Sequence, residues 1–416
     1  MTKEPKLHLF EGYGVELEYM IVDASSLAVK PITDKVIFDE VGAYVSDVEF
    51  ARIAWSNELV LHVIELKTNG PAEDLVGLPA LFQEHVNKIN KLLQRHNARL
   101  LPTGMHPFMD PYTETQLWPH EYNAVYEAYN RIFDCRGHGW SNLQSTHLNL
   151  PFANDEEFAR LHAAIRLLLP IIPALSASSP VKDSKISGFA DTRLEVYRHN
   201  QAKIPAIAGQ VIPEAVFSQE DYVQQILEPL YQDIKPYDPD GILQEEFLNS
   251  RGAIARFDRQ AIEIRIIDIQ ECPVADVAIL HLVVAVLKEL VAEKWSPLVE
   301  QKKWPEGELA SIFLEVVKQG RHTVISNPAY LSLFNLGDVT SCTAGEIWEH
   351  LLKGVQQTEV LPPTTSSAVQ LILNQGNLSE RLTRALGPEP TPEKIKEVYR
   401  ELADCLEQGR LFSPHS

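Results

Sequence analysis

Charged side chains alternate with apolar ones in several strand-like segments of this 416-residue chain. The clearest reads AIEIRIIDI at 261–269, and GVELEYMIV at 14–22 begins in the same way. ELVLHVIELK at 58–67 and NLQSTHLNL at 142–150 predict two further strands. Because successive side chains of a strand point to opposite faces, each segment has a polar face and an apolar face. The fold must therefore cover one side of these strands and leave polar groups together on the other.

Helical spacing of apolar residues marks the regions between and after these strands. The predicted helices lie at 72–96, 155–169, 274–293, 345–354, 365–374 and 392–407. Strands and helices do not alternate in short units, so the pattern favours an α+β fold with a largely antiparallel sheet over a doubly wound fold. We expect Asp155 to cap its helix. Residues 1–336 are predicted to form the main domain, and 337–416 a helical extension packed on it.

The charge balance narrows the classes of partner. With 57 acidic and 37 basic residues the net charge is −20, which repels phosphate backbones and anionic lipid. We therefore expect neither nucleic acid nor membrane as a partner, while self-association stays open. The apolar stretch 274–290 is interrupted by charged residues and is expected to be a buried helix. The amino terminus lacks a signal-like apolar stretch and the four cysteines are scattered, which favours a reducing, cytoplasmic location.

Two pairs of glutamates are candidate metal ligands. Glu16 and Glu18, two residues apart on a strand, project from one face, where like charges destabilise each other unless a cation neutralises them. A divalent cation with oxygen ligands would do so, although an exposed strand face is the commoner explanation for such a pair alone. Glu58 and Glu65 have an odd spacing, so we expect one on a turn and the other on the strand.

The remaining strands carry two more candidate pairs. His147 and Asn149 share one strand face, which suits a cation or a substrate's polar groups, although a lone strand histidine is more often structural. Glu263 and Arg265 share the polar face of an otherwise Ile-rich strand, where a purely structural ion pair is costly to bury. A metal ligand beside a phosphoryl-binding guanidinium is the functional alternative.

Familiar nucleotide-binding loops are missing from the sequence. It contains no phosphate-binding loop of the G-x-x-x-x-G-K-[ST] type, no dinucleotide-binding fingerprint and no nucleophile elbow. A bound nucleotide would therefore be held by metals and a sheet surface. Several arginines could bind phosphate or carboxylate groups, namely Arg193, Arg251, Arg256 and Arg259.

Six landmarks, taken in order, resemble the second family of glutamate–cysteine ligases and related carboxylate–amine ligases. They are GVELEY, IELKTNGP, TGMHPF, STHLNL, ALSASSP with GFADTR, and AIEIRIIDIQECP, spread over residues 12–276. The resemblance implies a glutamine-synthetase-like fold, in which a curved, largely antiparallel sheet forms a funnel-shaped active site flanked by helices. It also implies that an ATP-dependent reaction joins the γ-carboxylate of glutamate to the amine of cysteine through a γ-glutamyl phosphate. That reaction is the first step of glutathione-type thiol synthesis.

The resemblance also implies roles for residues of this chain. Two or three Mg²⁺ ions, with Mn²⁺ as an alternative, would be held by Glu16, Glu18, Glu58, Glu65, Glu263 and His147. Arg265 and Glu263 would be catalytic, with Arg265 stabilising the transferred phosphoryl group and Arg256 joining it at ATP. Arg193 would hold the α-carboxylate of glutamate. The amino-acid site would also be lined by Asn149 and His106.

The sequence departs from its relatives at one landmark and leaves three alternatives open. Many relatives carry an H-x-H pair where this chain has STHLN at 145–149, so whether His147 binds metal or substrate stays open. The amine pocket carries no signature, so a ligase for another amine or acid is the first alternative. A non-catalytic binding protein would have lost the carboxylates, and a metal-dependent hydrolase would turn over without ATP.

Overall fold

An eight-stranded antiparallel sheet forms the centre of the structure, a computed structural model that describes residues 6–414. Its main path runs β2-β3-β4-β1-β6-β10-β9, and β5 also pairs with β1. The strands are β1 (Gly14–Asp23), β2 (Asp47–Glu49), β3 (Ile53–Asn57), β4 (Val63–Thr68), β5 (Ala98–Leu101), β6 (Ser145–Pro151), β9 (Ala253–Arg256) and β10 (Ala261–Asp268). Two separate two-stranded sheets are formed by β7 (Val181–Lys182) with β8 (Lys185–Ile186), and by β11 (Val324–Ile325) with β12 (Cys342–Thr343). The predicted α+β class is confirmed.

The six predicted helices are present with shifted ends, and the structure adds others that were not predicted. The longer helices are α1 (Thr33–Val41), α2 (Leu78–Leu93), α4 (Asn123–Phe133), α6 (Asp155–Leu168), α8 (Thr192–Tyr197), α10 (Glu228–Ile234), α11 (Pro273–Val291), α13 (Glu306–Gln319), α15 (Ala344–Val355), α16 (Pro363–Gln375), α17 (Leu378–Leu386) and α18 (Pro392–Gln408). The shorter ones are α3 (Pro111–Glu114), α5 (His138–Ser141), α7 (Pro173–Ser176), α9 (Gln219–Tyr222), α12 (Leu298–Gln301) and α14 (Pro328–Ser332). Among the helices that were not predicted are α1, α4, α13 and α17.

Three predicted boundaries are wrong for local reasons. The helix predicted from residue 72 begins at Leu78, because Ala72 exchanges two backbone hydrogen bonds with Tyr13. The cap of α6 is Asn154 rather than Asp155, since the Asn154 side chain accepts a hydrogen bond from the backbone of Glu157. The strand predicted from residue 58 begins at Val63, after a turn that closes on Val60.

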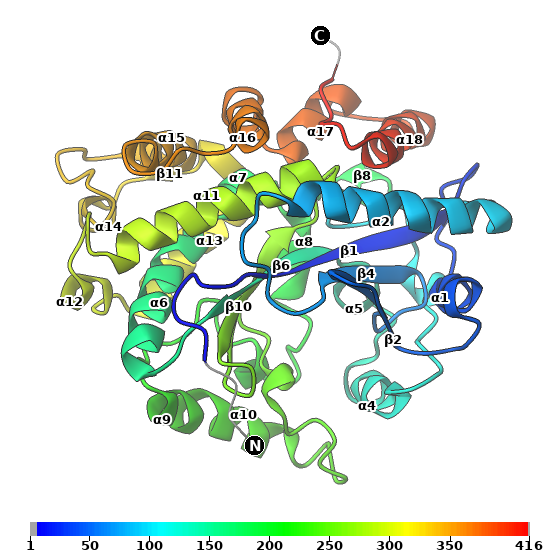
Figure 1. Cartoon of the computed structure of the whole chain (residues 1–416), viewed down its shortest axis with the longest axis horizontal. Coiled ribbons are helices and arrows are strands. Elements are labelled where there is room, and N and C mark those ends of the chain that lie inside the picture. Colours follow the sequence, from blue (N-terminus) through cyan, green and yellow to red (C-terminus); the bar gives the residue numbers. More distant parts are fainter. Residues whose placement is uncertain (1–5, 415–416) are drawn as a thin grey trace.

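The apolar face of the sheet packs under α2 and α11, and the helices α15 and α16 pack on α11 (Figure 1). Val15 and Leu17 of β1, Leu148 of β6 and Ile264 of β10 all join one buried cluster with Phe82 of α2. The apolar residues that alternate with charged ones along each strand thus all lie on one side of the sheet, and the charged ones lie on the other.

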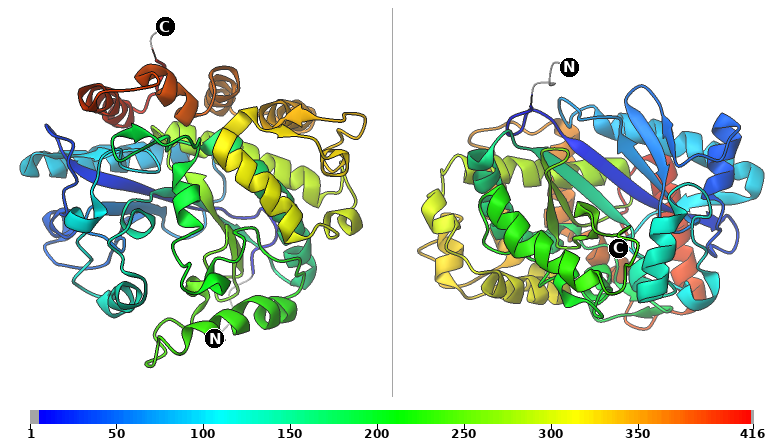
Figure 2. Two further views of the ribbon diagram at one scale, coloured as in Figure 1. Left: turned by 180° about the vertical axis from the view of Figure 1, so that it is seen from behind. Right: turned by 90° about the horizontal axis from the view of Figure 1, so that it is seen from below.

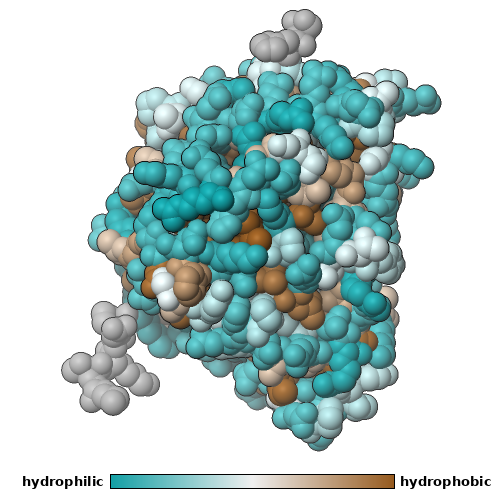
Figure 3. Space-filling model, turned by 90° about the vertical axis from the view of Figure 1, so that its right-hand side faces the viewer, coloured by the Kyte–Doolittle hydropathy of each residue, from teal (hydrophilic) through white to brown (hydrophobic). Residues whose placement is uncertain are grey.

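Helix α11 is buried along nearly its whole length, as predicted. Among residues 6–414, no helix combines the length and apolar character that a membrane crossing requires. The face of the molecule shown in Figure 3 is mostly hydrophilic, with smaller apolar patches.

The carboxy-terminal helices cover one end of the polar face. Met20 and Val22 follow Glu16 and Glu18 on the same side of β1 but belong to a second apolar cluster. Most of its other members come from β5, α17 and α18 and include Leu101, Leu382, Ile395, Val398, Tyr399 and Leu402. Helix α16 packs on α11, and α18 packs on β5 and α2. The division into a main domain and a helical extension at residue 336 stays a prediction.

A fully buried ion pair joins this extension to the sheet. Arg381 of α17 donates to Glu271, just beyond β10, over 2.5 Å between Nη1 and Oε1. The same guanidinium also donates to the carbonyl oxygens of Gly376 and Phe412. Both charged side chains have no solvent exposure, so each depends on the other for neutralisation.

We expect Arg381→Met to destabilise the protein by about 3–5 kcal/mol, because Glu271 would be left as a buried, unpaired charge. Urea unfolding measures this difference. Arg384→Met, three residues along the same helix and exposed, is the matched control and should change stability little. Equal stability of the two variants would contradict a structural role for the pair, and Glu271→Gln should recover part of the loss in the Arg381 variant.

Candidate active site

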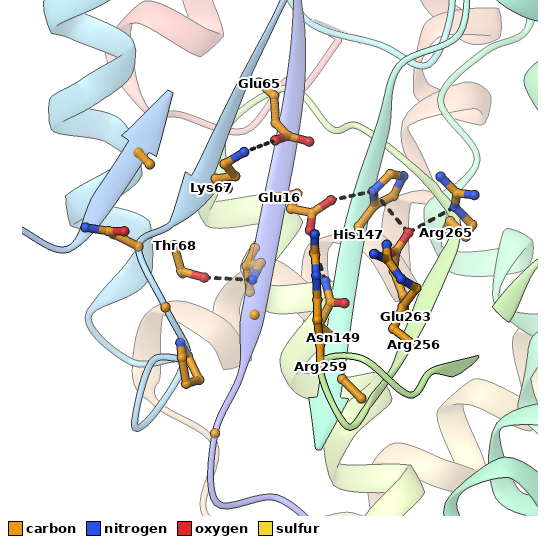
Figure 4. A pocket seen from close by; sticks show the side chains of 18 of the residues that line it. Glu16, Glu65, Lys67, Thr68, His147, Asn149, Arg256, Arg259, Glu263 and Arg265 are labelled. Carbon is orange, nitrogen blue, oxygen red and sulfur yellow. Dashed lines mark hydrogen bonds and ion pairs between the residues drawn. The ribbon is translucent and has the colours of Figure 1, made fainter. Parts of the chain in front are cut away.

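The polar face of the sheet gathers charged side chains from four adjacent strands. Strand pairing places Glu16 opposite His147, Glu18 opposite Glu65, and Glu263 opposite Asn149. Opposed residues of neighbouring strands point to the same side, so their side chains meet above the sheet. Figure 4 shows Glu16, Glu65, His147 and Glu263 converging in this way. The predictions that Glu16 and Glu18, His147 and Asn149, and Glu263 and Arg265 share one face are confirmed.

His147 lies at the centre of the group. Its Nδ1 is 2.7 Å from Oε2 of Glu16 and 3.8 Å from Oε1 of Glu263. Its Nε2 is 2.9 Å from the Ser145 hydroxyl oxygen and 3.8 Å from Oε1 of Glu18. One imidazole thus bridges carboxylates from two other strands.

Glu58 and Glu65 extend the group toward β3 and β4. Glu65 lies on β4, where its Oε1 accepts from the Ser56 hydroxyl at 2.6 Å and lies 3.3 Å from Lys67 Nζ. Glu58 follows the last residue of β3, Asn57, in the turn before β4. The expectation of one carboxylate on a turn and one on the strand is confirmed. Both side chains line the same cavity.

Crowding of carboxylates changes their acidity. Burial and then the neighbouring charges of Glu18 and Glu65 raise the pKa of Glu58 well above its ordinary value. Burial and the charge of Glu16 raise the pKa of Glu65 to about 7. Burial alone would raise the pKa of Glu16, but the hydrogen bond and charge of His147 outweigh it and lower that pKa to about 2. Negative charge therefore exceeds what the nearby cations compensate.

The same excess of negative charge raises the pKa of His147. Burial disfavours its charged form, but the hydrogen bond to Glu16 and the charges of Glu18 and Glu16 raise its pKa to about 9. The imidazole is therefore a cation at neutral pH when only protein groups surround it.

The residues present fit a divalent metal site. Ligand atoms of Glu16, His147 and Glu263 lie within 4.8 Å of one another, and so do those of Glu18, Glu65 and His147. Glu18, Glu65 and Glu263 are each less than one-tenth exposed, which makes their mutual repulsion costly without a cation. A set dominated by carboxylate oxygens suits Mg²⁺ or Mn²⁺ better than a soft metal.

Two arginines adjoin this group. Arg265 of β10 lies 3.0 Å from Glu263, between Nε and Oε1, and Arg256 of β9 lies 3.9 Å from the same carboxylate. Burial alone would lower the pKa of Arg265, but the charge of Glu263 outweighs burial, and the pKa lies above its ordinary value. Arg265 therefore stays fully charged beside the carboxylates, where an anion could reach it.

Two cavities meet at the carboxylates. The first, of about 550 Å³, is lined by β1, β4, β9 and β10 and contains Arg256 and Arg259. The second, of about 510 Å³, extends toward α4 and α8. Both are lined by Glu18, Glu58, His147, Phe247 and Arg265. Seen from below, the strands lie between α4 on one side and the α9–α10 region on the other (Figure 2).

Of four other residues predicted for the site, two line a cavity and two do not. Asn149 lines the first cavity and donates to Glu16 over 3.1 Å, and Arg193 borders the second but is only 2% exposed. His106 was expected in the amino-acid site, and that prediction is wrong: the ring is fully buried and bonds the Leu27 carbonyl, and burial lowers its pKa to about 3. Arg251 pairs with Glu214 and lines neither cavity.

Sequence analysis missed the aromatic side of the second cavity. Tyr122, Tyr126 and Tyr129 recur along α4 at helical spacing, and Trp140 faces them from α5. The spacing is a detectable signal, but it does not say which surface the stripe covers. Lys67 was also missed, although it shares the strand face of Glu65 two residues earlier.

Comparison with known proteins places these features in a family. The sequence model described as glutamate–cysteine ligase family 2 matches residues 13–401. An uncharacterized protein of Archaeoglobus fulgidus is 32% identical, over 96% of this chain and 99% of its own length. A Rubrobacter xylanophilus protein named "Putative glutamate--cysteine ligase 2-3" is 24% identical over 51% of this chain, an alignment that spans 53% of that relative.

Two solved structures share the fold. A glutamate–cysteine ligase of Francisella tularensis, in complex with AMP, aligns with a TM-score of 0.62 at 11% identity, covering 97% of this chain and 90% of that one. A bifunctional glutathione synthetase from Pasteurella multocida aligns with a TM-score of 0.57 at 14% identity, covering 96% and 52%. At such identities the likeness concerns the fold.

We expect Mg²⁺ binding near pH 7 to release protons, on the order of one per protein, because His147, whose pKa is raised to about 9, holds a proton that a bound cation displaces. Glu65, whose pKa is raised to about 7, adds a partly protonated carboxyl group, so the affinity for Mg²⁺ should rise from pH 6 to pH 8. Calorimetry in two buffers of different ionisation enthalpy counts the protons. Glu65→Gln should reduce the number, while Glu73→Gln, an exposed control, should not. Binding without proton release would contradict this electrostatic account.

Proposed function

The chain belongs to glutamate–cysteine ligase family 2, a family of carboxylate–amine ligases, and we propose that it is an ATP-dependent ligase that activates glutamate as γ-glutamyl phosphate. The observation that carries this proposal is the convergence of Glu16, Glu18, Glu65 and Glu263 with Arg265 where two cavities meet. A nucleotide and an acid–amine pair need adjoining sites with one shared reacting centre. The shared wall of the two cavities supplies such a centre.

The protein groups have separable tasks in this proposal. Glu16, Glu18, Glu58, Glu65 and Glu263, with His147, would hold the metal ions. When bound, Mg²⁺ supplies charge neutralisation for the phosphates of ATP. Arg265, held by Glu263 and the backbone carbonyl of Asn249, would face the charge that develops on the transferred phosphoryl group. Arg256, beside the same carboxylate, is positioned for the nucleotide phosphates.

Glutamate and cysteine are the first acid and amine to test, because the family description names them. The second cavity borders the same carboxylates, so an acid lying in it would present its carboxylate to the reacting centre. Arg193, which borders that cavity, would hold the α-carboxylate of the donor.

The test measures ADP release with ATP, Mg²⁺ and glutamate while the amine is varied, cysteine first. We expect release to require both glutamate and an amine. Arg265→Met should lower kcat by about 100-fold to 1000-fold, because a charge facing the phosphoryl group is lost. Arg95→Met, at an exposed arginine just after α2, is the matched control and should leave kcat unchanged. No consumption of ATP with any amine would overturn the ligase proposal, and turnover without ATP would favour a hydrolase.

A further inference from the structure

Strand β10 contains a bulge where it pairs with β6. The register shifts between Ile264 and Ile267 of β10. Arg265 and Ile266 together therefore face a single residue of β6, His147. A bulge takes one residue out of the regular ladder, bends the strand and changes the direction of the side chain at that point. The residue affected here is the arginine proposed to face the transferred phosphoryl group.

The bulge also decides which side of the sheet Asp268 faces. Asp268 follows Glu263 by an odd number of residues, and on a regular strand this spacing would send the two side chains to opposite faces. The extra residue reverses the alternation. Asp268 is paired with Ser145, whose hydroxyl donates to Glu18 on the polar face. Asp268 therefore lies on the same side of the sheet as the proposed reacting centre.

The Asp268 carboxylate is fully buried and is held from several directions. Its Oδ2 accepts from the backbone nitrogen of Ser178 at 2.9 Å and from the Ser179 hydroxyl at 2.7 Å. Its Oδ1 accepts from Nε of Arg193. Gly104 lies so close that a Cβ at that position would be 2.6 Å from Cγ of Asp268. The carboxylate is thus a fixed point to which Arg193 is attached.

Arg193 connects this fixed point to the bulge. The side chain is only 2% exposed, and its Nη1 and Nη2 lie 3.4 and 3.3 Å from the backbone carbonyl oxygen of Arg265. The backbone nitrogen of Arg265 donates to the Gly252 carbonyl at 3.0 Å. Buried backbone groups need such partners, and a bulge removes some of those that a regular ladder provides. The backbone of Arg265 is therefore held at both its carbonyl and its amide.

The place of the Arg265 guanidinium depends on this backbone. Its Nε lies 3.0 Å from Glu263, and its Nη1 donates to the Asn249 carbonyl over 3.4 Å. A group that stabilises charge on a transferred phosphoryl group acts only from the correct position, and a displacement of about 1 Å can lower the rate on the order of 100-fold. The form of the bulge therefore bears on catalysis as well as on folding.

We propose that Asp268 is a positioning residue of the ligase reaction. Through Arg193 it holds the bulge of β10 in the form that directs Arg265 toward the transferred phosphoryl group. This inference rests on the proposed function and adds to it a residue that lines neither cavity. Asp268 acts through the backbone of Arg265 and not by contact with a substrate.

A double-mutant cycle on kcat tests this connection. ADP release is measured with saturating ATP, Mg²⁺, glutamate and the amine that supports the fastest release. Asp268→Asn keeps the shape of the side chain but removes the charge that holds Arg193, so kcat should fall about tenfold while the KM for glutamate stays unchanged. In the Arg265→Met background the same change should lower kcat by less than about twofold, because the guanidinium that it positions is already absent.

Asp276→Asn is the matched control. Asp276 is also fully buried, in the first turn of α11, and burial raises its pKa to about 8, so the group is mostly protonated at pH 7. Its Oδ1 accepts from the Thr146 hydroxyl and from the backbone of Gln270, and an asparagine oxygen can accept both bonds. These bonds do not lead to Arg193, so kcat should stay unchanged.

A milder variant covers the case in which Asp268→Asn does not fold. Ser179→Ala removes the hydroxyl that donates to Asp268 and accepts from the backbone of Arg193, and it leaves the buried ion pair in place. It then takes the place of Asp268→Asn in the cycle. The expected fall in kcat is about threefold, and it should again be lost in the Arg265→Met background.

Three results would overturn this inference and leave the ligase proposal standing. The first is an unchanged kcat. The second is an equal loss of kcat with and without the Arg265 guanidinium, which would mean that Asp268 acts independently of it. The third is a higher KM for glutamate at unchanged kcat, which would place the effect on the α-carboxylate that Arg193 is proposed to hold. If the unaltered protein releases no ADP with any amine, both proposals are wrong.

Discussion

The meeting of several buried carboxylates on one side of a sheet is the constraint around which this molecule is organised. Glu18, Glu65 and Glu263 are each nearly inaccessible to water, and each lies in one of two carboxylate groups that share His147, Glu263 with Glu16 and Glu18 with Glu65. Such a group is unfavourable unless positive charge is close. His147 and Arg265 provide some of that charge from within the protein, and the raised pKa of Glu58 shows that they do not provide enough. A divalent cation would complete the balance, which is why metal binding and catalysis are proposed at one place.

The apolar side of the sheet stabilises the strands that carry these carboxylates. Side chains such as Leu17 and Ile264 pack under α2 and α11, so the backbone that carries the carboxylates is fixed by an apolar core. The carboxy-terminal helices extend this support. They cover the apolar end of β1 and are tied to the sheet by the buried pair of Arg381 and Glu271. Repulsion among the charged groups is thus opposed by packing on two sides.

The two cavities divide recognition between a charged end and an aromatic end. Glu18, Glu58 and His147 line both cavities, so they form the wall that the two share. Tyr129 and Trp140 line the second cavity alone, and they belong to α4 and α5 rather than to the sheet. The shared wall is thus set by the sheet and the turn after β3, whereas the aromatic lining comes from the connection between β5 and β6.

Sequence by itself determined the class of fold and much of the charged site. Alternation in GVELEY and AIEIRIIDI fixed which side chains share a face, because the pleat of a strand allows only two directions. The helix boundaries were less certain, and α17 between two Pro-rich segments was not predicted. Helix α2 begins later than predicted because the backbone of Ala72 pairs with that of Tyr13, a residue far away in the sequence.

Only the tertiary structure decided which candidate residues meet. The sequence offered His106 and His147 as comparable histidines, but one bonds a carbonyl in the interior and the other lies among carboxylates. It offered Arg193 as a free cation, yet folding places Asp268 against it. The spacing of the tyrosines near α4 could be read from the sequence, but the surface that they line could not. Local periodicity fixes the face of an element, whereas the partner of that face is set by long-range packing, which a single sequence does not contain.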